Sequence, residues 1–292
     1  MYILYYMNPM KTIHTITELK NELRNARKQG SSIGFVPTMG YLHEGHLNLV
    51  RECKKENDFT IASIFVNPVQ FAPHEDFDSY PRDMERDSRL LSDLGVDILF
   101  NPSREEIYPS GYMTYVEVEN LGKVLCGKSR GTHFRGVTTI VLKLLNIVSP
   151  DQAYFGRKDA QQAIIIKKMC RDLNLDVSIR TIPIARDTDG LALSSRNVYL
   201  SKEERASALF MPRALQLARS KMEDGLHDAA AVKELIRSEI SKTQLIKIDY
   251  VEVVSLDLLE EVSTVDPRNT LVAAAIWAGK TRLIDNFILG EI

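Results

Sequence analysis

The chain has 292 residues, 44% of them hydrophobic and 26% charged, with a formal net charge of −2 at pH 7. This length suggests two domains, and the composition excludes a wholly disordered protein. The near balance of acidic and basic residues argues against a general nucleic-acid binder, which carries a clear cationic excess.

The cysteines and the apolar runs of the sequence indicate the cellular compartment of the protein. The cysteines lie far apart in the sequence and form no metal-binding spacing, which favours a reducing cytoplasm. They are Cys53, Cys126 and Cys170. No apolar run approaches the roughly 20 residues that span a bilayer. The run Met1–Met7 lacks a basic region and a cleavage site, so we interpret Met1–Pro9 as a disordered leader or the product of an early start codon, with Met10 as the alternative start.

Short β-rich runs alternate with longer helical patterns up to about Asp187. The predicted strands are Ser32–Thr38, Thr60–Val66, Val96–Phe100, Gln152–Phe155 and Val177–Pro183. The predicted helices are Ile16–Gln29, His46–Asn57, Asp83–Leu94, Gly136–Val148 and Ala160–Leu173. Alternation of this kind implies right-handed crossovers and a mostly parallel sheet.

The pattern changes after Asp187. Helices are predicted over Lys202–Asp224 and Asp228–Lys242, and Pro212 should kink or split the first of them. The predicted strands that follow are Lys247–Val254, Thr270–Trp277 and Thr281–Leu289, with a hairpin turn at 278–280. We therefore predict an α/β domain over 1–187 and a smaller α+β domain over 188–292.

The segment Pro37–His46 runs from a predicted strand into the next helix. Open parallel sheets bind ligands where such strands end. Gly40 and Gly45 permit tight turns, and His43 and His46 lie three residues apart at a helix start. Imidazole N–H donors beside free backbone N–H groups and the positive end of a helix dipole make a phosphate site. The alternative is an ordinary turn with two incidental histidines.

Further polar segments also follow predicted strands or lie near the domain border. Gln70 offers a neutral amide that suits hydroxyls and a carboxylate. Lys158 offers a mobile positive charge, and Asp159 offers a helix N-cap or a hydroxyl acceptor. Two hydroxyls beside Arg196 make a phosphate clamp. The segments are Asn67–Phe71, Phe155–Gln162 and Leu193–Asn197, and none contains a P-loop or a GxGxxG motif. Taken alone, Gln70 is consistent with a solvated loop glutamine and Leu193–Asn197 with an ordinary linker.

Together these segments resemble the pantoate–β-alanine ligase (pantothenate synthetase) family of the HxGH nucleotidyltransferase superfamily. The motifs PTMGYLHEGH, FVNPVQF, YPRD, THFRGV, YFGRKDAQQ and DGLALSSRNVYL occur in the family's order and at its spacing, between Gly34 and Leu200. RLIDN at Arg282–Asn286 is also similar. The resemblance implies a Rossmann-like, mostly parallel sheet with helices on both faces, a smaller C-terminal α+β lid domain, and a homodimer.

The resemblance implies a reaction in two steps. The carboxylate of pantoate attacks the α-phosphorus of ATP, giving pantoyl adenylate and pyrophosphate. The amine of β-alanine then attacks the acyl carbon, releasing pantothenate and AMP. A carboxylic acid has a reference pKa of about 4, so the first nucleophile arrives ionised and needs alignment and charge neutralisation rather than a base.

The resemblance also assigns roles residue by residue. The catalytic residues that it implies are His46, His43, Lys158 and Arg196. The ATP-binding residues that it implies are Met39, Gly40, Tyr41, Leu42, His43, Glu44, Gly45, His46, Gly156, Arg157, Lys158, Asp159, Ala185, Leu193, Ser194, Ser195 and Arg196. Pantoate binding falls to Gln70 and Gln162, and β-alanine binding to Gln70. Tyr41 stands where the family usually has alanine, and we expect it to narrow the entrance to the first loop.

No metal site on the protein is expected, and Mg²⁺ should arrive with ATP. Asp83 and Asp87 are spaced at i and i+4 and offer a water-mediated site. The neighbouring Arg86 favours a surface ion-pair face instead.

Two other functions compete with the ligase. One is another HxGH nucleotidyltransferase, acting on a phosphorylated alcohol or nicotinamide mononucleotide. Gln70 and Gln162 disfavour it, because a pocket for a phosphorylated substrate would contain more Arg and Lys. The other is a non-catalytic nucleotide sensor on the same fold, which an intact set of His46, Lys158 and Arg196 disfavours. We expect small-molecule substrates, no nucleic-acid partner and no membrane partner.

Overall fold

The computed structural model describes residues 9–72 and 75–291, in which the chain forms two compact units. The first unit contains the described residues of Met1–Val118, Thr132–Phe155 and Ile166–Ile182, and the second those of Glu119–Gly131, Gly156–Ile165 and Pro183–Ile292. The units interleave along the sequence, whereas the predicted domains are continuous ranges with a boundary near Asp187, which stays a prediction. The expectation for Met1–Pro9 lies outside the described residues except at Pro9.

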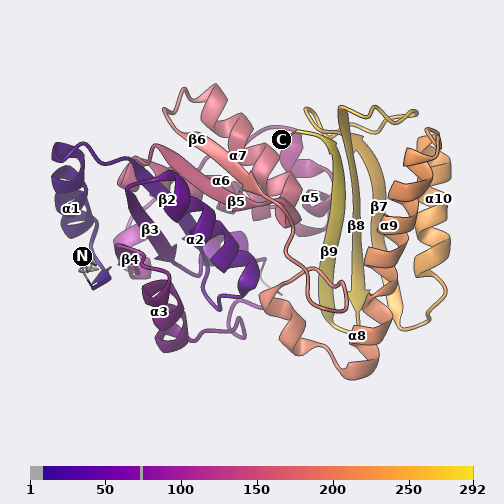
Figure 1. Cartoon of the computed structure of the whole chain (residues 1–292), viewed down its shortest axis with the longest axis horizontal. Coiled ribbons are helices and arrows are strands. Elements are labelled where there is room, and N and C mark those ends of the chain that lie inside the picture. The colour runs from indigo at the N-terminus through magenta and orange to yellow at the C-terminus, as the bar shows by residue number, and fades with distance from the viewer. Residues whose placement is uncertain (1–8, 73–74, 292) are drawn as a thin grey trace, which may run out of the picture. The chain divides into compact units, whose positions relative to one another are not determined.

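The first unit is built on a six-stranded sheet with the strand order β1-β4-β3-β2-β5-β6 (Figure 1). Its strands are β1 Lys11–Ile13, β2 Ile33–Thr38, β3 Phe59–Ile64, β4 Ile98–Phe100, β5 Gln152–Gly156 and β6 Ser178–Ile182. The pairings of β1 with β4, β4 with β3, β3 with β2 and β2 with β5 are all parallel, as predicted. The short strand β1 is missing from the sequence prediction because three residues are too few to show an alternating pattern.

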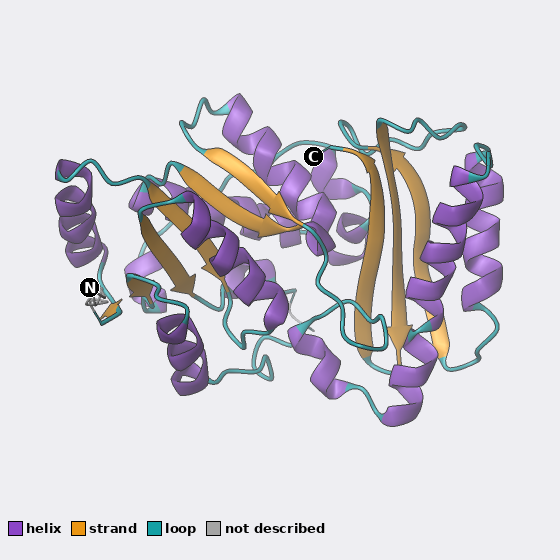
Figure 2. Cartoon of the chain, viewed as in Figure 1, coloured by secondary structure: helices purple, strands orange, loops and turns teal. Residues whose placement is uncertain are grey.

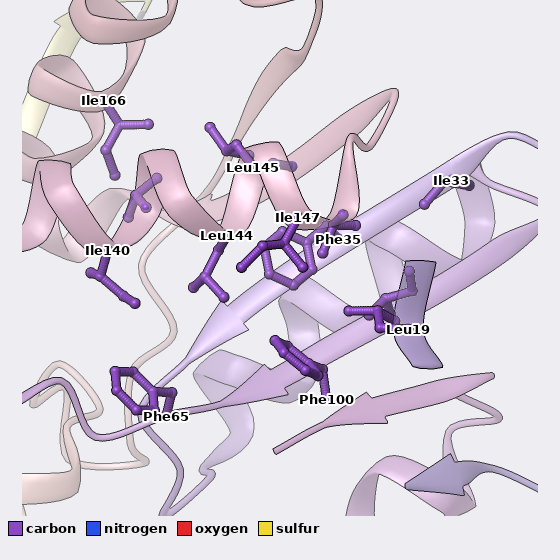
Figure 3. Packing of buried hydrophobic residues seen from close by; sticks show 14 of the residues in the cluster. Leu19, Ile33, Phe35, Phe65, Phe100, Ile140, Leu144, Leu145, Ile147 and Ile166 are labelled. Carbon is purple, nitrogen blue, oxygen red and sulfur yellow. The ribbon is translucent and has the colours of Figure 1, made fainter. Parts of the chain in front are cut away.

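Helices cover both faces of this sheet because neighbouring residues of a buried strand point to opposite sides. On one face Phe35 packs in a cluster with Leu144 of the helix His133–Val148, and Figure 3 shows both side chains. On the other face Val36 packs with Val50 of the helix Glu44–Glu56 and with Leu91 of the helix Met84–Asp93. The helices named in the first unit are α1 Ile16–Lys28, α2 Glu44–Glu56, α3 Met84–Asp93 and α6 His133–Val148, and α7 Ala160–Asp172 crosses from the second unit into the first. The predicted two-sided α/β architecture is confirmed.

Several short helices and 3-10 turns were not predicted from the sequence. They are the helices α4 Arg104–Ile107 and α5 Cys126–Arg130 and the 3-10 turns η1 Pro68–Gln70, η2 Leu121–Lys123, η3 Arg157–Asp159 and η4 Ser195–Tyr199. A single turn is too short to establish a helical period in the sequence. Within the described ranges, no helix is long and apolar enough to cross a membrane.

The second unit contains an antiparallel sheet with the order β7-β8-β9, accompanied by helices (Figure 2). The strands are β7 Ile246–Ser255, β8 Asn269–Ala278 and β9 Thr281–Gly290, and the helices are α8 Lys202–Ala208, α9 Phe210–Glu223 and α10 Ala229–Ile240. Ala278 pairs with Thr281, which leaves a two-residue loop in which Gly279 has a φ of +58°. This confirms the predicted hairpin turn, since glycine adopts a left-handed backbone at little cost.

Pro212 splits the predicted helix 202–224 into two. Helix α8 ends at Ala208 and α9 begins at Phe210, so Pro212 is the third residue of the second helix. In a continuous helix the proline ring would clash with the carbonyl of Ala208, four residues earlier. Leu209 therefore stands between two helices, and the predicted split is confirmed.

Candidate active site

The loop between β2 and α2 turns back sharply at Gly40. Gly40 has a φ of +81°, and a Cβ added there would lie 3.0 Å from Ile64 and 3.2 Å from Asp87. Tyr41, which follows, also has a left-handed backbone with a φ of +49°. The predicted tight turn at Gly40 is confirmed. Gly45 forms no such turn, because α2 begins at Glu44, two residues earlier than predicted.

His43 and His46 close the start of α2 with their own rings. His43 is the N-cap residue, and its Nδ1 accepts the backbone N–H of Gly45 at 3.2 Å. The backbone N–H of His43 donates to Nδ1 of His46 at 3.3 Å, and the two ring centroids are 4.0 Å apart. Because Nδ1 of each ring accepts a hydrogen bond, the proton of each neutral ring belongs on Nε2. The rings therefore lie together as predicted, but the N–H of Gly45 is not free for a phosphate.

A buried carboxylate holds the backbone of this loop. Asp87 of α3 accepts the N–H of Tyr41 at 2.6 Å and that of Leu42 at 2.8 Å. Arg86 donates to the carbonyl of Leu42 at 2.9 Å, and its guanidinium lies 5.6 Å from the ring centroid of Tyr41. Burial raises the pKa of Asp87, and the two backbone N–H groups oppose that rise.

Asp87 does pair with Arg86, at 3.4 Å, but the expectation that it lies on a surface face is wrong. Its carboxylate is buried, and both oxygens already accept backbone N–H groups, so it does not fit a Mg²⁺ ligand. Asp83 is the N-cap of α3 and accepts the N–H of Arg86 at 3.1 Å. Throughout the described part of the chain, no three His, Cys, Asp or Glu residues are grouped so that they could hold a metal ion.

Gln70 is buried and oriented by its neighbours, with 8% of its surface exposed. Its Nε2 donates to Sδ of Met39 at 2.8 Å, and its Oε1 accepts from Asn67 at 3.1 Å. Asn67 is itself buried and accepts the hydroxyl of Tyr108 at 2.9 Å. His133 Nδ1 lies 2.8 Å from the carbonyl of Gln70. The interpretation of Gln70 as an ordinary solvated loop residue is therefore excluded.

In the second unit, η3 carries Lys158 between β5 and α7. The Lys158 side chain is 20% exposed, and its Nζ lies 3.6 Å from Oδ2 of Asp159. Gly156, just before this turn, has no atom within 4 Å of where a Cβ would stand, which agrees with its predicted role of giving room. Gln162 is half-buried in the first turn of α7.

A hairpin in the second unit brings Ala185 beside Leu193. The N–H of Leu193 donates to the carbonyl of Ala185 at 2.9 Å, although the two residues are eight positions apart. Ser194 then caps η4, because its Oγ accepts the N–H of Arg196 at 3.3 Å. The Ser194 hydroxyl keeps its proton as a donor, so the predicted clamp of hydroxyls beside Arg196 is compatible with this geometry.

Sequence reasoning singled out Gln162 but missed its neighbour Gln161. The buried Gln161 side chain donates to the carbonyls of Leu121 at 2.9 Å and Val124 at 2.7 Å, and accepts the N–H of Cys126 at 3.0 Å. It thereby fixes the segment around η2 and α5. Only the doubled glutamine in YFGRKDAQQ marks this position, and nothing local distinguishes the two roles.

The sequence and the fold both match proteins of one family. A sequence profile of the family pantoate-beta-alanine ligase matches residues 11–288. The chain belongs to this family. The pantothenate synthetase of Caldicellulosiruptor bescii is 54% identical over 280 residues, covering 96% of this chain and 99% of that protein. That of Acetivibrio thermocellus is 56% identical over 280 residues, with the same coverage of 96% and 99%.

Solved structures of pantothenate synthetases share the fold of this chain. That of Thermus thermophilus has a TM-score of 0.91 and 42% identity, covering 97% of this chain and 100% of that one. The pantoate-beta-alanine ligase of Francisella tularensis, solved in complex with beta-gamma ATP and beta-alanine, has a TM-score of 0.78 and 36% identity, covering 96% and 97%. The family resemblance read from the motifs is confirmed, and the chain is an enzyme, a pantoate–β-alanine ligase that serves pantothenate formation.

Proposed function

We propose that this ligase condenses (R)-pantoate with β-alanine in two steps and uses ATP as a substrate. The first step forms pantoyl adenylate and pyrophosphate, and the second forms pantothenate and AMP. The observation that carries the proposal is the pair His43 and His46 at the start of α2, with Nδ1 of each ring engaged by backbone N–H. Because Nδ1 of each ring accepts a backbone N–H, the ring proton belongs on Nε2, and an imidazole N–H donor at this position suits the phosphates of ATP.

The first unit binds and orients pantoate in this proposal. Gln70 uses one of its two N–H bonds on Met39 and one oxygen lone pair on Asn67, so it keeps one donor and one acceptor. A buried amide held from both ends presents these groups at a fixed angle, which aligns a hydroxy acid. The pantoate carboxylate is ionised at neutral pH, so adenylation requires no general base.

The second unit supplies positive charge for the ATP-dependent step. Lys158 and Arg196 are the cations proposed to face the triphosphate, together with the hydroxyls of Ser194 and Ser195. Charge builds on the bridging oxygen as pyrophosphate leaves, and preorganised donors and cations stabilise it. In the second step the same groups stabilise the negative charge that AMP carries away. Gln162 is proposed as a further pantoate contact.

Mg²⁺ is proposed to arrive bound to the phosphates of ATP. The engaged carboxylate of Asp87 does not fit a protein ligand for it. We likewise propose a cytoplasmic homodimer with small-molecule substrates and no membrane or nucleic-acid partner. Sedimentation velocity of the purified protein tests the dimer, which is expected at twice the mass of one chain.

One assay tests the proposed reaction. Purified enzyme is mixed with pantoate, β-alanine, ATP and Mg²⁺, and AMP is measured while each component is omitted in turn. Steady AMP formation should need all of them, and pantoate with ATP alone should support pyrophosphate exchange into ATP. Absence of AMP in the complete mixture contradicts the proposal. Pyrophosphate release with a phosphorylated alcohol or nicotinamide mononucleotide in place of pantoate would instead indicate the competing nucleotidyltransferase.

A further inference from the structure

Two neighbouring residues of β9, Asp285 and Asn286, reach the two loop regions of the second unit that carry predicted ATP-binding residues. Both lie in the RLIDN motif, to which the sequence assigns no function. The side chain of Asp285 is fully buried, and Asn286 is 5% exposed. Successive residues of a strand point to opposite faces, so one short stretch of strand can hold two different partners.

Asn286 holds the backbone on both sides of Lys158. Its Nδ2 donates to the carbonyl of Arg157 at 3.0 Å and to the carbonyl of Lys158 at 2.9 Å. The Cα of Lys158 lies between these two carbonyls, so a single amide group fixes the point from which the lysine side chain extends. The long lysine side chain has several rotatable bonds, and its ammonium is placed reproducibly only if that point is fixed.

Asp285 holds the hairpin that leads to the other loop. Its two oxygens accept from the two terminal nitrogens of Arg186 at 2.7 Å and 3.0 Å. Arg186 forms a bridge with Ala192, the residue before Leu193, and also donates to the carbonyl of Gly190 at 3.1 Å. A paired, bidentate contact of this kind combines strength with a defined geometry. Leu193 begins the predicted ATP-binding loop that ends at Arg196.

Asp285 and Asn286 are also joined to each other. Asp285 accepts the backbone N–H of Asn286 at 2.8 Å, and β9 packs against both η3 and η4. The hairpin has a second tie, because Arg205 of α8 donates to Asp187 at 2.7 Å and to Asp189 at 2.8 Å. Arg205 therefore holds the turn of the hairpin, whereas Asp285 holds Arg186, which pairs with Ala192 at the open end of the hairpin.

We propose that Asp285 and Asn286 are positioning residues that set Lys158 and Arg196 for the ATP-dependent step through one rigid strand. The inference rests on the proposed function, because it takes Lys158 and Arg196 as groups that act on ATP. Neither positioning residue touches a substrate in this account. Their effect on catalysis passes through the backbone of η3 and through the hairpin before η4.

The experiment compares Asn286→Ala and Asp285→Asn with the control Asn269→Ala. Asn269 lies in β8 of the same sheet and also holds backbone, since it accepts the N–H of Leu256 at 2.9 Å. Each variant is measured for melting temperature, for the KM of ATP and of β-alanine, and for amide hydrogen exchange of peptides over 156–162 and 185–197. Losing a buried donor or a charge-assisted pair should raise the KM of ATP roughly ten- to a hundredfold.

The expected pattern separates positioning from general stability. Asn286→Ala should speed exchange over 156–162, and Asp285→Asn should speed it over 185–197, with the KM of β-alanine within twofold of wild type. Asn269→Ala should lower the melting temperature and leave both peptides and the KM of ATP unchanged. The inference is overturned if Asn286→Ala leaves both the KM of ATP and the exchange rate over 156–162 unchanged. It is also overturned if Asn269→Ala raises the KM of ATP as much as Asn286→Ala does.

A milder variant covers the case in which Asn286→Ala does not fold. Asn286→Ser keeps a donor that is one bond shorter than the amide, so it contacts the two carbonyls more weakly, and its KM of ATP and exchange should lie between wild type and a full loss. Wild-type values in Asn286→Ser would contradict the inference. The exchange readout does not depend on turnover. A wild-type protein that forms no AMP therefore refutes the proposed function, whereas unaltered exchange in the variants refutes the positioning role.

Discussion

The loop after β2 and the loops of the second unit are held by opposite kinds of chemistry. In the loop after β2, the backbone N–H groups of Tyr41 and Leu42 donate to the buried carboxylate of Asp87, which is an acceptor. The turn at Lys158 offers backbone carbonyls to its support, and the support is a donor, the amide of Asn286. The comparison shows that the residue type of a support follows from which backbone group the loop leaves unpaired.

The two regions also differ in how far along the chain the support lies. His43 and His46 are three positions apart, and Asp87 follows Tyr41 by 46 positions. Asn286 follows Lys158 by 128 positions. The first loop can therefore form as soon as its neighbouring elements fold, whereas the Lys158 turn depends on the last strand of the chain. The predictions below test whether this contrast is reflected in function.

The largest effect is expected for His46→Ala. The change removes one preorganised donor and the acceptor that braces the His43 N–H, so adenylation should slow by roughly 10²–10³-fold. Pantoate-dependent exchange of pyrophosphate into ATP measures this step. His14→Ala is the matched control, because His14 is exposed and bonded to the Asn101 carbonyl, and it should exchange at the wild-type rate. A folded His46→Ala enzyme with wild-type exchange would contradict the assignment.

Lys158→Ala should come next, with a loss of about 10² in the same exchange reaction. Lys158→Arg should restore part of the rate, because a guanidinium keeps the charge but differs in shape and reach. Lys168→Ala is the control, since Lys168 pairs on the surface with Asp172. An arginine variant with unchanged kinetics would show that Lys158 makes no closely fitted phosphate contact.

Asp87→Asn should reduce adenylation by roughly tenfold. The amide of asparagine replaces one acceptor with a donor, which then faces the N–H of Tyr41 or of Leu42 and leaves that buried group unsatisfied. Asp93→Asn is the control on the same helix, where Asp93 is exposed. The KM of ATP and the exchange rate are measured for both. Equal effects in the two variants would mean that the carboxylate of Asp87 does not hold the loop.

The smallest effect concerns the buried thiols. Burial raises the pKa of Cys53 to about 12 and that of Cys170 to about 11, so both stay protonated in the folded protein. At pH 8 the thiolate fraction of Cys53 should be roughly 10³-fold below that of an unfolded chain. Labelling with a disulfide reagent should therefore be very slow, and fast labelling of native protein would contradict this.

The same thiols give a pH dependence with a definite sign. The unfolded chain loses each thiol proton at a pH of about 8.5, whereas the folded chain holds it to higher pH. The folded state therefore binds more protons above pH 8.5, and the free energy of unfolding should fall as the pH rises through that window.

Labelling of single-cysteine variants can follow the opening of each unit separately, because Cys53 lies in the first unit and Cys126 in the second. The labelling rates of the Cys53 variant and of the Cys126 variant, each measured at increasing urea concentration, would show which unit opens first.

Local signals in the sequence predicted a large part of this fold. The strand and helix alternation of the first unit, the split at Pro212 and the turn at Gly279 each depend on residues within one or two turns of chain. The turn at Gly40 and the pairing of the His43 and His46 rings were predictable for the same reason, because a helix start and its cap are adjacent in sequence.

The supports of the site could not be predicted, because each acts across the fold. Asp87 looked like a surface residue beside Arg86, and only the folded chain shows its oxygens on the backbone of Tyr41 and Leu42. Asn67, Gln161 and Asn286 are amides whose partners lie up to 129 positions away. All three lie inside the family motifs, but a motif does not say which backbone groups an amide holds in the folded chain.

The left-handed backbone of Tyr41 has a further consequence. A residue other than glycine in this conformation costs about 1–2 kcal/mol, and an alanine at this position would carry that strain with no ring to offset it. In this chain the aromatic face lies under Arg86, an interaction of about 0.5–1 kcal/mol at an exposed site. The ring of Tyr41 thus braces the loop locally, and trimming it to a methyl group would remove this contact while the carbonyl of Leu42 still accepts from Arg86.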